Sequence, residues 1–66
     1  MTIFLNGEPV EMADNATVSD LAEKLGLRPV GTAVAVNGRV VRRADWALTA
    51  LAANDKVMVI NAAYGG

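Results

Sequence analysis

The sequence predicts an α+β fold in two layers, in which a single helix covers one face of a β-sheet. Two Asn-Gly pairs each lie between β-prone segments, which is the pattern of two hairpins. One amphipathic helical stripe lies between the hairpins, and a last apolar segment, residues 56–60, predicts one more strand. Because one helix covers only one face of such a sheet, the other face is expected to be open.

The two hairpins are located by their turns. Asn-Gly accepts the positive φ angles of a type I′ turn, so Asn6-Gly7 and Asn37-Gly38 are the expected turns. Pro9 lacks the N–H that a ladder hydrogen bond needs. It therefore either places the second strand at an edge of the sheet or is the first residue of that strand. The four hairpin strands are expected at residues 2–5, 10–12, 33–36 and 39–41.

One helix is predicted between the hairpins. Thr17 can cap its start, and Asp20, three residues later, favours the positive end of the helix dipole. Gly26 is suited to the position after the helix, Leu27 can pack back on it, and Pro29 blocks continuation. The apolar stripe follows the spacing i, i+3, i+4 and i+7 and consists of Val18, Leu21, Ala22 and Leu25.

Two further elements complete the chain. Residues 43–53 are expected to contain a short helical turn that carries Trp46 and Leu48, with Trp46 in the core or in a lid over it. After a turn at Asn54-Asp55, the last strand has apolar residues on both faces, as a central strand has. The core between helix and sheet is predicted to consist of Ile3, Leu5, Val18, Leu21, Leu25, Val57 and Val59.

Length and composition narrow the possible functions. We expect one domain, residues 1–66, with residues 62–66 as a flexible C-terminal tail, because 66 residues are too few for two domains. The absence of Cys and His excludes a Cys/His zinc site, a thiol nucleophile and a Ser-His-Asp triad, and we expect no metal. A net charge of −1 argues against nucleic acid or an anionic membrane as partner. A reducing compartment, the cytoplasm, fits a chain without cysteine.

The charged residues give no sign of catalysis. The carboxylates are scattered along the chain and form no general acid–base constellation, so we expect no catalytic residue. Arg39, Arg42 and Arg43 form a small basic cluster. The cluster is interpreted as a charged edge strand that discourages aggregation, with contact to an acidic partner as the alternative.

The chain ends in Ala62-Ala63-Tyr64-Gly65-Gly66. Gly has no Cβ, so a Gly-Gly end is thin and its last carbonyl is unhindered. Five extended residues reach at most about 18 Å, which lets the end thread a narrow active site while the folded body stays outside. Because a carboxylate is ionised at neutral pH and is a poor electrophile, acyl chemistry at this end requires a separate activating enzyme.

Six parts of the chain share their pattern with a known family: Ile3-Phe4-Leu5-Asn6-Gly7, Thr17-Val18-x-x-Leu21, Ala33-Val34-Ala35-Val36-Asn37, Arg43-x-x-Trp46, the Asp55 turn and Gly65-Gly66. With them, essentially the whole chain resembles the ubiquitin-like β-grasp sulfur carriers, and among these the ThiS-type carriers of thiamin biosynthesis. Members often have Pro-Arg-x-x-Trp in the fourth part, where this chain has Arg42 in place of Pro. The resemblance implies a β-grasp fold, a mixed sheet of four to five strands with one main helix on one face.

The resemblance also implies a carrier rather than an enzyme. An E1-like adenylyltransferase of the ThiF type would use ATP to convert the Gly66 carboxylate to an acyl-adenylate. A persulfide sulfur donor would displace AMP and leave a thiocarboxylate, from which a thiazole synthase of the ThiG type would take the sulfur. The chain itself would bind no cofactor, since ATP is used by the activating partner. Gly65, Tyr64 and Ala63 would thread the active sites of these partners.

Three alternatives stay open. The small subunit of molybdopterin synthase shares the fold and the tail, although the Arg43-x-x-Trp46 segment favours the thiamin carrier. A ubiquitin-like protein modifier would use the same adenylation. A non-covalent ubiquitin-like interaction module would have an incidental Gly-Gly end.

A surplus of apolar side chains, 53% of the residues, predicts a docking face. Strand residues alternate sides, so if its sequence neighbours face the helix, Phe4 faces away, and the same alternation turns Met58 and Ile60 outward. The resemblance implies that the first and last strands are neighbours. Phe4, Met58 and Ile60 are therefore expected to share one apolar patch that docks a partner, unless residues 43–53 or a second copy of the chain cover it.

Overall fold

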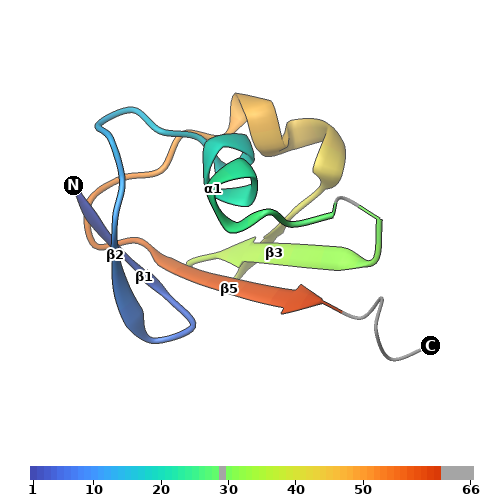
Figure 1. The fold of residues 1–66 in the computed structure, drawn as a ribbon, viewed down its shortest axis with the longest axis horizontal. Helices are drawn as coiled ribbons and strands as arrows, with labels where there is room; N and C mark the ends of the chain where they lie inside the picture. The colour runs from blue at the N-terminus through green and yellow to red at the C-terminus, as the bar shows by residue number, and fades with distance from the viewer. Residues whose placement is uncertain (29, 62–66) are drawn as a thin grey trace.

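A computed structural model describes residues 1–28 and 30–61 and shows a five-stranded sheet with helices on one side (Figure 1). The strand order is β2-β1-β5-β3-β4, with β1 and β5 parallel and the other neighbours antiparallel. The predicted α+β class and the mixed sheet are thereby confirmed. The elements are β1 (Thr2–Leu5), β2 (Glu8–Glu11), α1 (Val18–Leu25), β3 (Thr32–Val36), β4 (Arg39–Val41), the 3₁₀ helix η1 (Arg43–Leu48) and β5 (Lys56–Asn61).

The last strand, β5, lies at the centre of the sheet. It pairs in parallel with β1 through Phe4↔Lys56 and Leu5↔Val57. On its other side, antiparallel pairing with β3 runs along the strand from Val36↔Val57 to Thr32↔Asn61. The expectation of a central last strand that neighbours the first is confirmed.

Both predicted hairpins form around two-residue Asn-Gly turns. The pair Leu5↔Glu8 closes the first turn, where the φ angles of Asn6 and Gly7 are 49° and 87°. Positive φ at both central residues is the geometry of a type I′ turn. The expected start of the second strand at residue 10 was wrong, because pairing begins directly after the turn. Pro9 therefore lies inside β2, and β2 is an edge strand, which is the first of the two alternatives expected for Pro9.

The predicted signals at both ends of α1 are present. The backbone N–H of Asp20 donates to the Thr17 hydroxyl at 3.1 Å, and the Thr17 N–H donates to the Asp20 carboxylate at 2.9 Å, which forms a capping box. At the other end Gly26 has φ 67°, and the N–H of Leu27 donates to the carbonyl of Ala22 at 2.9 Å. This Schellman motif ends the helix where the sequence predicts.

The core lies between the sheet and the helices. Of the seven residues predicted for it, four are buried, namely Ile3, Val18, Leu21 and Val57. Leu5 and Val59 are partly buried and pack against them. Leu25 was wrongly assigned to the core, since 38% of it is exposed. It is the last residue of α1, whose buried residues all lie within the first five positions, so Leu25 lies past the covered part of the helix.

The segment after β4 packs beside α1, on the helix side of the sheet (Figure 1). Trp46 of η1 is buried, and its indole N–H donates to the carbonyl of Val41 at 2.9 Å, which satisfies its one polar atom. Leu48 is 81% exposed, so of the two apolar side chains expected on this turn only Trp46 belongs to the core. The N–H of Leu51 donates to the carbonyl of Ala16 at 2.7 Å and fixes the segment to the start of the helix.

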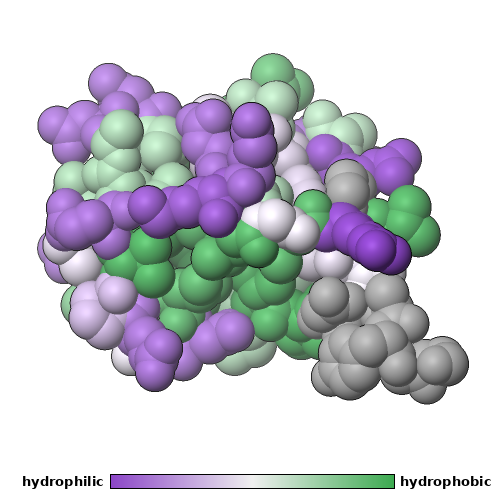
Figure 2. All heavy atoms as spheres, viewed as in Figure 1, coloured by the Kyte–Doolittle hydropathy of each residue, from purple (hydrophilic) through white to green (hydrophobic). Residues whose placement is uncertain are grey.

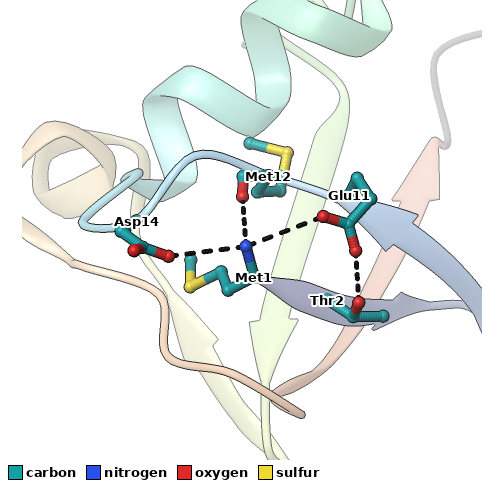
Figure 3. A network of polar contacts seen from close by, with 5 residues as sticks. All are labelled: Met1, Thr2, Glu11, Met12 and Asp14. Atoms are coloured by element: carbon teal, nitrogen blue, oxygen red, sulfur yellow. Dashed lines mark hydrogen bonds and ion pairs between the residues drawn. The ribbon is translucent and has the colours of Figure 1, made fainter.

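A polar network holds the start of β1 against the end of β2 (Figure 3). The amino group of Met1 donates to the carbonyl of Met12 at 2.7 Å and lies 3.4 Å from the Asp14 carboxylate. Its distance to the Glu11 carboxylate is 3.7 Å, and Glu11 also accepts a hydrogen bond from the hydroxyl of Thr2. Because both carboxylates are largely exposed, these ion pairs contribute little stability and mainly fix the strand end.

Two leucines of α1 provide a matched test of the core assignment. Leu21→Ala should lower the free energy of unfolding by about 2–5 kcal/mol, because it removes a side chain that is 1% exposed and leaves a cavity. Leu25→Ala makes the same chemical change at a half-covered position and should cost clearly less. Thermal and urea unfolding of both variants measure the difference. Equal losses of stability would show that the burial of the helix stripe is wrongly described.

Candidate functional site

The site predicted from sequence has two parts, of which the structure describes one. Ala63, Tyr64, Gly65 and Gly66 lie outside the described residues, so their assignment as tail and activated terminus stays a prediction. The prediction of a single domain with a tail at 62–66 stays open for the same reason. The described strand that leads to these residues is β5, which ends at Asn61.

The open face of the sheet carries the second part, the predicted apolar patch. Side chains alternate along β5 as expected: Val57 is 2% exposed on the helix side, whereas Met58 and Ile60 are 55% and 56% exposed. Phe4 lies on β1 beside the start of β5. The 43–53 segment packs on the helix side, so within the part of the chain that the structure describes it does not cover this patch.

Phe4, Met58 and Ile60 line one surface hollow, which we call the sheet hollow. Figure 2 shows apolar side chains gathered over β5 and the adjoining part of β1, bordered by hydrophilic ones. Lys56 is the one charged residue among those that line the hollow. The full lining is Phe4, Asn6, Gly7, Ala35, Asn37, Gly38, Lys56, Val57, Met58, Val59 and Ile60.

The apolar surface extends beyond the three predicted residues. Ala35 of β3 is paired with Met58 on one side and with Val40 of β4 on the other, so all three share the open face. Val40 is 74% exposed. Sequence reasoning did not assign Ala35 and Val40 to this face. The two-residue turn at Asn37-Gly38 was the available signal, because it sets the hairpin register that pairs these two residues on one face.

The two turn asparagines are also part of this surface, and sequence reasoning assigned them only to turns. The N–H of Val59 donates to Oδ1 of Asn6 at 3.0 Å, and Nδ2 of Asn6 donates to the carbonyl of Val59 at 3.4 Å. The N–H of Lys56 donates to Oδ1 of Asn37 at 2.9 Å. Both side chains therefore bind β5, one from each neighbouring hairpin.

Among the described residues, we find no further site formed by the charged side chains. Arg39 lies on β4, an edge strand, and Arg42 pairs with Asp45 of its own chain at 3.4 Å. Within residues 1–28 and 30–61, no three Asp or Glu side chains lie close enough together to hold a metal ion. In the same ranges no helix is long and apolar enough to cross a membrane.

Comparison with known proteins places this geometry in a family. The model of the ThiS family matches residues 3–66. The chain is 32% identical to the sulfur carrier protein ThiS of Escherichia coli (strain K12) over 66 residues, which is 100% of both chains.

Two solved structures share the fold. The crystal structure of the thiamine biosynthesis protein (ThiS) from Geobacter metallireducens superimposes with a TM-score of 0.81 at 25% identity, covering 91% of each chain. A solution structure of a thiamine biosynthesis protein from the same organism gives a TM-score of 0.77 at 27% identity, covering 91% of this chain and 81% of that one. In sequence and in fold, this chain belongs to the ThiS family, with its ubiquitin-like β-grasp architecture.

Proposed function

We propose that this chain is a sulfur carrier of thiamin biosynthesis and that the carboxylate of Gly66 carries the sulfur. Family membership along residues 3–66 is the observation that carries the proposal. The relatives that it resembles are named for sulfur carriage and thiamine biosynthesis, which favours this pathway over molybdopterin synthesis. The Gly65-Gly66 end supplies an unhindered carboxylate for the chemistry.

The chemistry takes place on the carboxylate and uses groups of the partners. In an adenylyltransferase, a carboxylate oxygen of Gly66 attacks the α-phosphate of ATP and releases pyrophosphate. The acyl-adenylate makes the carbonyl electrophilic, and the terminal sulfur of a persulfide then displaces AMP. Cleavage of the sulfur–sulfur bond by a thiol leaves the thiocarboxylate, whose sulfur passes to a thiazole synthase. The Gly66 carboxylate is the group that is converted, and every acid, base and further nucleophile comes from a partner, so this chain acts as a co-substrate.

The sheet hollow is the proposed docking surface for these partners. Burying its apolar lining against a partner is favourable, because water is released from that surface. Lys56, which also lines the hollow, favours a partner with a carboxylate in the facing position. The hollow lies on β5, the strand that continues toward Gly66. A partner that covers the hollow therefore binds the carrier next to β5, and from this strand the C-terminal residues must reach the active site of the partner.

The terminal carboxylate can be tested by changing its position. Deletion of Gly66, or addition of one residue after it, should abolish thiocarboxylate formation, because the activated group is then absent or displaced. Gly65→Val should slow loading severely, since a β-branched side chain thickens and stiffens the end. Mass spectrometry after incubation with ATP, an active adenylyltransferase and a sulfur source measures the product. Full loading of the deletion variant would refute the role of Gly66.

The docking surface can be tested with two groups of apolar positions. The double variant Phe4→Ala, Ile60→Ser should weaken binding to the adenylyltransferase or the thiazole synthase by at least about tenfold, or roughly 1.4 kcal/mol. Leu48→Ser also removes an exposed apolar side chain, 81% exposed on η1, and should leave affinity unchanged. Titration calorimetry measures both variants, with circular dichroism to verify folding. Unchanged affinity in the folded double variant would remove the docking role without affecting Gly66.

A further inference from the structure

The two sides of β5 are paired to different extents. On one side β3 accompanies the strand as far as the pair Thr32↔Asn61. On the other side the ladder with β1 ends at Leu5↔Val57, where the chain turns away into the first hairpin. Val59 therefore lies past the end of β1, at the point where β5 continues toward the terminus.

Asn6 occupies the place that a longer β1 would fill. Its backbone N–H donates to the carbonyl of Val57 at 2.8 Å and continues the ladder by one step. Its side-chain amide then accepts from the N–H of Val59 at 3.0 Å and donates to the carbonyl of Val59 at 3.4 Å. One carboxamide thus supplies the acceptor and the donor that a strand residue would present to Val59.

The second hairpin contains a matched residue at the other end of β5. Asn37 occupies the same position of its Asn-Gly turn, with φ 51° against 49° for Asn6. Its side chain accepts from the N–H of Lys56 at 2.9 Å and donates to the Asp55 carboxylate at 2.9 Å. Asn37 therefore holds the beginning of the strand and Asn6 its later part.

We propose that Asn6 is a positioning residue for the carrier terminus, which it directs by holding Val59 to the sheet; this inference rests on the proposed function. Gly66 follows Asn61 by five residues, which span at most about 18 Å. With so short a connection, the direction in which β5 leaves the sheet determines whether the carboxylate reaches the α-phosphate of ATP. Reacting atoms must approach to about 3–3.5 Å in the correct orientation, and a misplacement of about 1 Å can lower the rate about 100-fold. Fraying of β5 at Val59 would therefore slow the reaction even when the body is bound.

The position of Asn6 links this role to docking. Asn6 lines the sheet hollow together with Met58 and Val59. A partner that covers the hollow therefore contacts the same short stretch of β5 that the amide holds. The same stretch of β5 is then both covered by the partner and aligned by Asn6. Loss of the Asn6 amide should affect the alignment of the strand more than the binding of the partner.

The test uses Asn6→Gly with Asn15→Gly as its matched control, because Asn15 also has a positive φ, 67°, and does not line the sheet hollow. Gly accepts the positive φ of both positions, so each change removes the amide without backbone strain. Amide hydrogen exchange followed by NMR measures how firmly the backbone of β5 is held. Steady-state kinetics of pyrophosphate release, with the carrier as the varied substrate, give the kcat and KM of adenylation. Asn6→Gly should speed exchange at Val59 about tenfold and lower kcat about tenfold, with KM changed less than twofold. Asn15→Gly should leave both the exchange at Val59 and kcat within twofold of the wild-type values.

Some results would overturn the role of Asn6 and leave the proposed function in place. These are unchanged exchange at Val59 in Asn6→Gly, unchanged kcat despite faster exchange there, and an equal loss of kcat in Asn15→Gly. A loss confined to KM would likewise assign Asn6 to docking instead of positioning. Failure of the unaltered chain to be adenylated by an enzyme that loads a control carrier would overturn the proposed function itself, and with it this role.

Discussion

β5 is the last strand along the chain and the central strand of the sheet, held in parallel by β1 and antiparallel by β3. The two halves of the protein meet only through this strand in the sheet, because β2 pairs with β1 and β4 pairs with β3. Its alternation presents Val57 to the core and Met58 to the open face. Removing β5 would therefore separate the hairpins and open the core.

Within residues 1–28 and 30–61, helices cover only one face of the sheet (Figure 1). A chain of 66 residues buries about 60% of the surface that its unfolded form exposes, and this chain has no disulfide to add stability. One helix and the η1 segment suffice to cover one face, around Leu21 and Trp46. The apolar residues of the other face contribute little to the core, which leaves them available for a partner. In the proposed function, folding and docking thus use opposite sides of the same strands.

The two Asn-Gly turns have a function beyond reversing the chain. A turn needs only residues that accept positive φ, and Gly would meet that requirement at each position. Asn adds a carboxamide, and both carboxamides bind the backbone of β5, at Val59 and at Lys56. The central strand is thereby held where its neighbours end, and the hairpins are connected to the strand that links them. The local turn chemistry and the long-range sheet pairing depend on the same two residues.

Local chemistry was enough to predict much of this protein. The capping box at Thr17, the left-handed Gly26 and the type I′ turns depend on residues within a few positions of one another, so the sequence alone determined the helix and both hairpins. The edge position of Pro9 and the alternation that exposes Met58 follow from equally local rules. Leu25 was assigned wrongly because periodicity gives the face of a helix but not the length over which that face is covered. Only the tertiary structure decided how far the core covers α1, that β3 pairs with β5 so that Val40 joins Met58 on the open face, and that Asn6 binds Val59, 53 residues away. These features depend on which strands meet and in what register, and no pattern along a single segment contains that information.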